Sequence, residues 1–193
     1  MNDYCQPSFY RFNSDSLKLV EFIKNRVSKS HSILDLGAGC GIIGIELAKY
    51  YFPVNLILLE LQNDFLPSLE KNLQEYLPRE TKGEIIISSF SNFKAQRKFD
   101  LVVSNPPYYL PKHGEPSSDR RRGLARSFIQ DNWTIFLRLL RESLNPEGEG
   151  FVVIKNDKVI LEEVRQSVLT SSLVIKEWVE GDLVFLNFRL NVD

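Results

Sequence analysis

Short apolar runs alternate with longer amphipathic segments along most of this chain. Apolar runs bounded by turn residues predict strands, at 32–36, 54–59, 84–87, 99–104 and 150–154. Apolar residues spaced three and four positions apart predict helices, at 15–28, 42–51, 64–76, 128–144 and 158–169. Two further β-like runs, 173–179 and 183–190, flank Glu180-Gly181-Asp182, a hairpin signal. The alternation predicts an α/β fold with seven strands in a mostly parallel sheet whose last strand is antiparallel.

Local signals also predict where some elements begin. Ser14 or Asp15 is the expected cap of the first helix. Asn145-Pro146-Glu147-Gly148 is expected to form a turn ahead of the strand at 150–154. A long polar loop is expected over about 110–126, directly after the fourth strand and its proline-containing turn.

Three alternating glycines, Gly37, Gly39 and Gly41, follow the first strand and lead into a helical pattern. Glycines there let the chain turn sharply and let a ligand approach the main chain, while the helix start offers unpaired N–H groups. The spacing departs from the G-x-G-x-x-G of dinucleotide sites, and Asp35 just before the glycines is a poor neighbour for phosphate. We therefore expect a cationic, phosphate-free nucleoside such as S-adenosylmethionine. The alternative is a glycine-rich turn without a ligand.

Glu60 ends the second strand, about 20 residues beyond the glycine loop. An acidic residue at this distance accepts hydrogen bonds from ribose hydroxyls in nucleotide-binding α/β folds. Taken alone, Glu60 is consistent with an ordinary exposed glutamate at a strand end. Together with the glycine loop, it predicts a ribose contact.

Asn105-Pro106-Pro107-Tyr108 follows the strand at 99–104, and so lies at the sheet edge where open α/β folds bind ligands. The two prolines fix two φ angles and remove two N–H donors, which leaves a stiff turn that presents carbonyl oxygens. With the Asn105 side-chain oxygen and the Tyr108 ring, this turn suits a planar group that carries an NH2. The plainer alternative is a loop that contains a proline pair.

Composition limits the possible functions without selecting one. The 193 residues are 43% hydrophobic and 25% charged with a net charge of −1, which fits one domain and shows no overall basic excess for nucleic acid. Two cysteines, Cys5 and Cys40, argue against a disulfide framework or a zinc cluster, and the isolated His31 and His113 predict no metal site. Without a long apolar run or signal-peptide features, we expect a soluble cytoplasmic protein.

The succession LDLGAGCG, Glu60, SNPPY and the terminal hairpin resembles class I S-adenosylmethionine-dependent methyltransferases, over nearly the whole chain from residue 31. The resemblance implies a Rossmann-like sheet with helices on both faces. It also implies a methyltransferase domain at 31–193 after an N-terminal extension with a helix at 1–30. NPPY is similar to the motif of amino-group enzymes, which methylate adenine N6, guanine N2 of ribosomal RNA, or a glutamine of release factors.

Two further stretches are similar to the bacterial family that methylates adenine N6 in valine tRNA. They are Tyr10-Arg11-Phe12 with Asp15-Ser16-Leu17, and Gly123-Leu124-Ala125-Arg126. The resemblance implies cofactor contacts for Asp35, Gly37, Ala38, Gly39, Gly41, Glu60, Leu61 and Asn105. It implies that the target amino group is held by Asn105, Pro106, Pro107 and Tyr108. The family usually carries an acidic residue for the cofactor's adenine amine; here Ser89 or the Phe90 backbone is expected to replace it.

Contact with a polymer is expected in the loop after NPPY, where basic residues gather: Lys112, Arg120, Arg121, Arg122 and Arg126. They would contact phosphates while an unstacked base enters the site; the alternative is a solvated loop tethered by salt bridges. A tRNA is the favoured substrate, selected by the loops or by an accessory protein. Three other functions stay open: a protein-glutamine methyltransferase of the release-factor type, a guanine-N2 methyltransferase of ribosomal RNA, and a catalytically silent scaffold with this fold.

Overall fold

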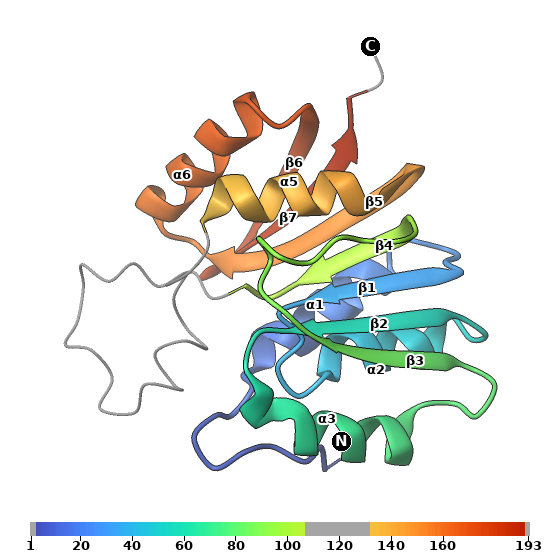
Figure 1. Cartoon of the computed structure of the whole chain (residues 1–193). Helices are drawn as coiled ribbons and strands as arrows, with labels where there is room; N and C mark the ends of the chain where they lie inside the picture. Colours follow the sequence, from blue (N-terminus) through green and yellow to red (C-terminus); the bar gives the residue numbers. More distant parts are fainter. Residues whose placement is uncertain (1–2, 107–131, 192–193) are drawn as a thin grey trace.

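The computed structural model describes residues 3–106 and 132–191, and seven strands within these ranges form one sheet (Figure 1). The strands are β1 (Ser32–Leu36), β2 (Asn55–Glu60), β3 (Lys82–Ile87), β4 (Phe99–Ser104), β5 (Leu144–Lys155), β6 (Leu173–Glu180) and β7 (Leu183–Leu190). Their order is β3-β2-β1-β4-β5-β7-β6. β7 is antiparallel to both β5 and β6, whereas the other neighbours are parallel. The predicted sheet with an antiparallel last strand is confirmed.

Helices cover both faces of the sheet, namely α1 (Ser14–Lys24), α2 (Ile42–Tyr50), α3 (Leu66–Tyr76), α5 (Trp133–Ser143) and α6 (Lys158–Leu169). The first three share one hydrophobic core and the last two share the other. Successive strand residues alternate between these cores, as the pleat requires: Phe151 and Val153 of β5 face the first core, and Val152 and Ile154 the second. Among the helices that the structure describes, none is long and apolar enough to cross a membrane.

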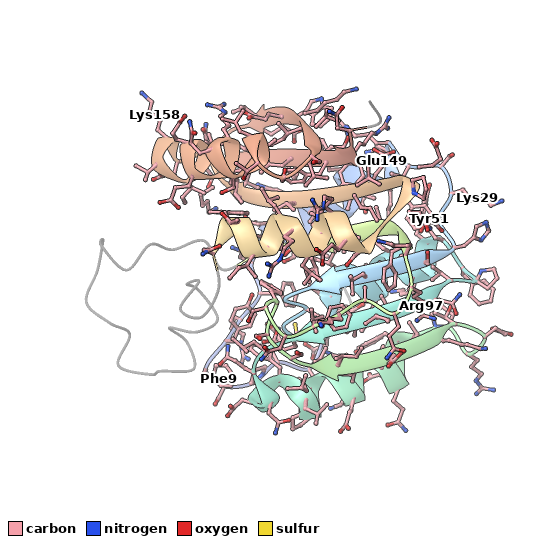
Figure 2. The ribbon with its side chains drawn as sticks, turned by 45° about the horizontal axis from the view of Figure 1, so that its top comes forward. Phe9, Lys29, Tyr51, Arg97, Glu149 and Lys158 are labelled. Atoms are coloured by element: carbon pink, nitrogen blue, oxygen red, sulfur yellow. The ribbon has the colours of Figure 1, made fainter. Side chains whose placement is uncertain are left out.

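The parallel strands all point in one direction, so their carboxyl ends lie together at one end of the molecule. Phe9 lies at that end, where it packs on Phe65 just after β2, with ring centroids 5.3 Å apart. Lys29 and Arg97, which precede β1 and β4, lie at the opposite end (Figure 2). Ligands of open α/β sheets bind outside the carboxyl ends, so the end marked by Phe9 is where a site is expected.

Two helices begin differently from the prediction. Asn13, rather than Ser14 or Asp15, caps α1, with an extended backbone (φ −104°) and a side-chain oxygen 3.2 Å from the Asp15 amide nitrogen. An asparagine one residue earlier satisfies an N–H group that the helix start leaves unpaired, which corrects the predicted cap. The helix predicted from residue 64 begins as a 3-10 turn, η1 (Asn63–Phe65), and continues as α3.

The turn predicted ahead of the fifth strand is wrong, because those residues belong to an irregular start of β5. Leu144 pairs with Phe99 of β4 and Glu149 pairs with Leu101, so the residues between them bulge out of the ladder. Gly148 lies directly against the β4 backbone, where a Cβ would stand 2.6 Å from the Phe99 carbonyl oxygen. Residues of turn character are therefore accommodated inside the strand.

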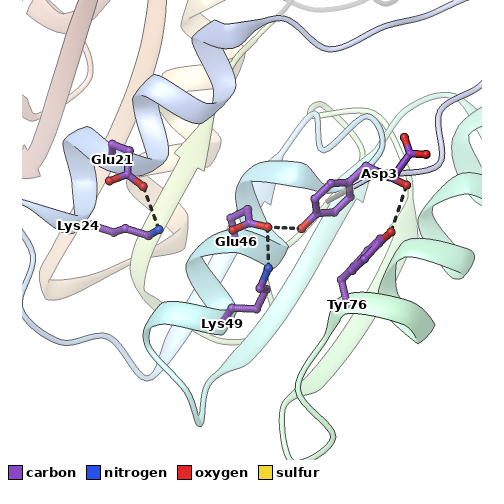
Figure 3. Close-up of polar contacts among 7 residues, drawn as sticks. Asp3, Glu21, Lys24, Glu46, Lys49 and Tyr76 are labelled. Atoms are coloured by element: carbon purple, nitrogen blue, oxygen red, sulfur yellow. Dashed lines mark hydrogen bonds and ion pairs between the residues drawn. The ribbon is translucent and has the colours of Figure 1, made fainter. Parts of the chain in front are cut away.

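The segment ahead of α1 lies across α2 and α3. The Tyr4 hydroxyl donates to Glu46 Oε1 at 2.6 Å, and the same carboxylate pairs with Lys49 at 2.8 Å (Figure 3). The Tyr76 hydroxyl donates to the Asp3 carbonyl oxygen at 3.1 Å. Tyr4 is also part of the first core, so the described part of the predicted extension packs against the sheet domain. The division of the chain at residue 31 stays a prediction.

Candidate functional site

The glycine loop lies between β1 and α2, at the carboxyl end of the sheet. Gly37, Gly39 and Gly41 have φ values of +72°, +57° and +83°, in the left-handed region that side chains disfavour. The N–H groups of Gly37 and Ala38 both donate to the Leu59 carbonyl oxygen at 2.9 Å, which ties the loop to β2. The predicted sharp turn is therefore a fixed main-chain cradle.

Glu60, the last residue of β2, holds this loop from the side. Its Oε2 accepts from the Gly39 N–H at 2.8 Å, and its Oε1 accepts from the Gln62 N–H at 2.9 Å. Burial raises the pKa of Glu60, and the hydrogen bonds from backbone N–H groups oppose that rise. A carboxylate offers about four acceptor positions, so positions remain for the two hydroxyls of a ribose. The sequence predicted the ribose contact but not the hydrogen bond to the glycine loop.

Asp35, in β1, is fully buried next to the same loop. Its Oδ2 accepts from the Gly44 N–H at 2.9 Å, and no described residue bonds to its Oδ1. Burial raises the pKa of Asp35 to about 7; the Gly44 hydrogen bond lowers it and the Glu60 charge adds to the rise. Two neighbouring buried carboxylates make this part of the molecule electronegative, which favours a cationic ligand over a phosphate.

Aromatic side chains surround the glycine loop. A Cβ added to Gly37 would lie 3.6 Å from the Phe90 ring. A Cβ added to Gly39 would lie 3.8 Å from the Phe65 ring and 3.9 Å from the Tyr10 ring. Tyr10 and Phe65 meet edge to face, with centroids 5.2 Å apart. Rings in this arrangement suit the flat faces of a nucleoside. Phe65 had no sequence signal beyond its hydrophobicity, because its place depends on how η1 follows β2.

The stretch after β3 was expected to replace the missing acidic residue. The Ser89 hydroxyl oxygen accepts from the Asn92 N–H at 3.2 Å and lies 3.0 Å from the Ser91 hydroxyl oxygen. Ser89 therefore holds the turn that carries Phe90, and the Phe90 backbone becomes the stronger candidate for a contact with an adenine. Leu61 is half-buried directly after β2, and its place beside that base stays a prediction.

Asn105 follows β4 and lies next to the glycine loop. β4 pairs with β1 so that Val103 stands opposite Asp35. The Ser104 hydroxyl donates to the Leu36 carbonyl oxygen at 2.6 Å, so the two strands end side by side and Asn105 follows the neighbour of the strand that leads into the glycine loop. The Asn105 Nδ2 donates to the Ser16 hydroxyl oxygen at 3.1 Å. The glycine loop and the described start of the NPPY motif therefore lie at one edge of the sheet, and α1 reaches the same place.

The structure covers only part of the predicted acceptor and polymer sites. Pro106 is described and buried, whereas Pro107, Tyr108, Lys112, Arg120, Arg121, Arg122 and Arg126 lie outside the described residues, and their roles stay predictions. Ser16 is a candidate that the sequence interpretation did not assign. Its only signal was its position beside Asp15 in the segment that resembles the tRNA enzymes.

Comparison with known proteins connects this geometry to a family. A family model described as the methyltransferase small domain matches residues 8–177. A tRNA1(Val) (adenine(37)-N6)-methyltransferase of Glaesserella parasuis is 31% identical over 153 residues, which cover 78% of this chain and 62% of that protein. A ribosomal protein uL3 glutamine methyltransferase of Francisella tularensis is 34% identical over 84 residues, which cover 44% of this chain and 26% of that protein.

A solved structure shares the fold. A 16S rRNA N2 methyltransferase of T. thermophilus, in complex with AdoMet and guanosine, matches with a TM-score of 0.69 at 19% identity, over 95% of this chain and 44% of that chain. The predicted Rossmann-like methyltransferase fold is thereby confirmed. This chain spans less than two thirds of the length of the curated relatives described above. The family model nevertheless covers most of this chain, including the glycine loop, Glu60 and Asn105, and the chain therefore belongs to the methyltransferase small domain family.

Proposed function

We propose that this protein transfers a methyl group from S-adenosylmethionine to an exocyclic amino group, and that adenine N6 of a tRNA is the favoured acceptor. One observation carries the proposal: Asn105 stands beside the glycine loop with its amide nitrogen bonded to Ser16. The amide oxygen has no donor among the described residues. An oriented acceptor next to a nucleoside-type cradle suits an amino substrate, and membership of the family supports methyl transfer.

The described residues fit S-adenosylmethionine. The positive φ angles open the main chain of the loop, and Glu60 keeps acceptor positions for ribose hydroxyls. Asp35 adds a buried carboxyl, and its ionised form favours a cationic nucleoside. When bound, this cofactor supplies an electrophilic methyl group on a sulfonium. The residues proposed to hold it are Asp35, Gly37, Ala38, Gly39, Gly41, Glu60, Leu61, the Phe90 backbone and Asn105.

The acceptor side needs a way to activate a weak nucleophile. The lone pair of an aromatic amine is delocalised into its ring. If Asn105 Oδ1 and the Pro106 carbonyl each accept one N–H, the nitrogen is favoured in a more pyramidal form with a freer lone pair. These hydrogen bonds strengthen as positive charge develops on nitrogen, so they act on the transition state. Pro107 would keep the turn stiff and Tyr108 would stack on the base.

The substrate class is supported by the Glaesserella relative, whose name specifies adenine 37 of a valine tRNA. We propose that the basic residues after the NPPY turn contact phosphates of that substrate, namely Lys112, Arg120, Arg121, Arg122 and Arg126. An accessory protein would add to substrate choice. The second candidate function is methylation of a protein glutamine, which the Francisella relative favours because a side-chain carboxamide presents a similar planar NH2.

The test uses purified full chain with radiolabelled S-adenosylmethionine and, separately, total tRNA, ribosomal RNA, DNA, release factor and ribosomal proteins. Asn105→Ala is expected to lower transfer about 100- to 1,000-fold, the usual effect of removing one transition-state hydrogen bond. Cofactor affinity, measured by calorimetry, should fall far less than transfer, because the other proposed cofactor contacts remain. Asn145→Ala is the matched control, because Asn145 binds Asp100 at 2.6 Å at the opposite end of the sheet.

Each outcome has a distinct meaning. Label in tRNA that is recovered as N6-methyladenosine and lost in Asn105→Ala supports the proposal. Label in protein glutamine alone supports the second candidate. If no acceptor is labelled and calorimetry detects no cofactor binding, the chain is a scaffold with a methyltransferase fold, and the proposal is wrong.

A further inference from the structure

The first turn of α1 is joined to the carboxyl ends of two central strands. Ser16 accepts the hydrogen bond from Asn105 Nδ2, which follows β4, at 3.1 Å. One residue earlier, Asp15 Oδ2 pairs with Lys155 Nζ, at the end of β5, at 3.0 Å. Asn13, the helix cap, donates to the same Asp15 oxygen at 2.6 Å. The helix start is thus held against the site at two separate points.

Both residues of α1 that make these contacts are buried: Asp15 is 4% exposed and Ser16 is 3% exposed. A buried carboxylate and a buried hydroxyl hold their neighbours in place more strictly than exposed groups do, because a displaced partner would leave them unsatisfied. The Lys155 side chain, 31% exposed, closes the ion pair from the solvent side. Lys155 also pairs with Asp182 at 2.9 Å, so its ammonium is held between two carboxylates. The position of Ser16 relative to β4 is therefore set by tertiary contacts on both sides.

In the structure, the contact with Ser16 engages the nitrogen end of the Asn105 amide. An amide presents two N–H donors at one end and an oxygen acceptor at the other. With Nδ2 engaged by Ser16, the oxygen is free of donors among the described residues and stays available to an incoming N–H. A reversed amide would present its own NH2 to the substrate amino group, where two donors would face each other.

We propose that Ser16 is a positioning residue that orients the Asn105 amide for the acceptor amino group, and that the Asp15–Lys155 ion pair fixes the turn that carries it. This inference rests on the proposed function and deepens it. It makes the start of α1 a structural part of the acceptor site. Ser16 itself has no contact with the reacting atoms; it acts through Asn105.

The kinetic test compares Ser16→Ala with Ser16→Thr, using the acceptor that the unmodified chain labels. Ser16→Ala should lower kcat about 3- to 10-fold, which corresponds to one ordinary hydrogen bond, with the cofactor Kd unchanged. Ser16→Thr keeps the hydroxyl and should recover most of that loss. Ser14→Ala is the matched control, because Ser14 is an exposed serine of the same helix turn, and it should behave as the unmodified chain. Lys155→Met should show a smaller loss of kcat.

A second measurement does not depend on activity. The side-chain amide protons of Asn105, assigned by their absence from an Asn105→Ala spectrum, should exchange with water more slowly in the unmodified chain than in Ser16→Ala. Unchanged exchange, an unchanged kcat in Ser16→Ala, or no recovery in Ser16→Thr would each overturn the inference. If no amino acceptor is labelled by the unmodified chain, the proposed function fails, and the exchange measurement still decides whether Ser16 orients the amide.

Discussion

The buried carboxyl of Asp35 makes the stability of this protein depend on pH in a defined way. Its pKa rises from 3.8 to about 7 on burial, with one oxygen bonded to Gly44 and the other without a partner among the described residues. The folded state therefore holds the proton up to about pH 7, whereas the unfolded chain releases it near 3.8. The contribution of Asp35 to the unfolding free energy is therefore fully present below pH 3.8 and is lost as the pH rises from 3.8 to about 7.

The magnitude follows from the width of the window. One pKa unit corresponds to about 1.4 kcal/mol. Between pH 5 and pH 8 the unfolded carboxyl is ionised throughout, and the folded one ionises near the end of this range. The reference is Asp35→Asn, whose side chain does not titrate and still offers an oxygen to the Gly44 N–H. From pH 5 to pH 8, the unfolding free energy of the unmodified chain should fall by about 2 to 3 kcal/mol more than that of Asp35→Asn.

Urea unfolding of both chains at pH 5, 6, 7 and 8 measures this difference. Subtracting one profile from the other removes the titration of groups that both chains share. Glu163→Gln, which removes an exposed carboxyl from α6, should follow the unmodified chain at every pH. Parallel profiles for Asp35→Asn and the unmodified chain would mean that Asp35 is already ionised in the folded protein at pH 5, and the reasoning from burial would be refuted.

Two substitutions test the packing that holds the glycine loop. Asn72 is fully buried, accepts from the Cys5 N–H at 2.8 Å, and donates to the carbonyl oxygens of Cys5 and Cys40 at 3.0 and 2.8 Å. Asn72→Ala should lower the unfolding free energy by about 2 to 4 kcal/mol; a loss under about 0.5 kcal/mol in urea would contradict this. Gly44→Ala would place a Cβ 2.7 Å from a Leu58 methyl and should cost about 1 to 3 kcal/mol. An unchanged melting temperature would contradict this, because it would mean that the side chains around Gly44 move aside without a loss of stability.

The hydrophobic pattern determined most of the fold by itself. Strands covered on both faces appear in the sequence as continuous apolar runs, and helices appear as apolar residues spaced three and four positions apart. Both patterns follow from the local geometry of the backbone. The glycine loop and the NPPY motif were likewise recognisable, because each directly follows an apolar strand pattern in the sequence. Chain order then predicted both at the carboxyl edge, where the structure bonds Ser104, just before Asn105, to Leu36, just before Gly37.

Contacts between distant parts of the chain were decided only by the tertiary structure. The bond between Ser16 and Asn105 joins residues 89 positions apart, and the bond between Glu60 and Gly39 joins two separate strand ends. Serine and glutamate have many possible partners, and sequence spacing does not choose among them. Which one each meets depends on how strands align in the sheet and on where α1 packs. The sequence thus predicted which residues form the site, and the packing of α1 against β4 and β5 determined how Asn105 is held.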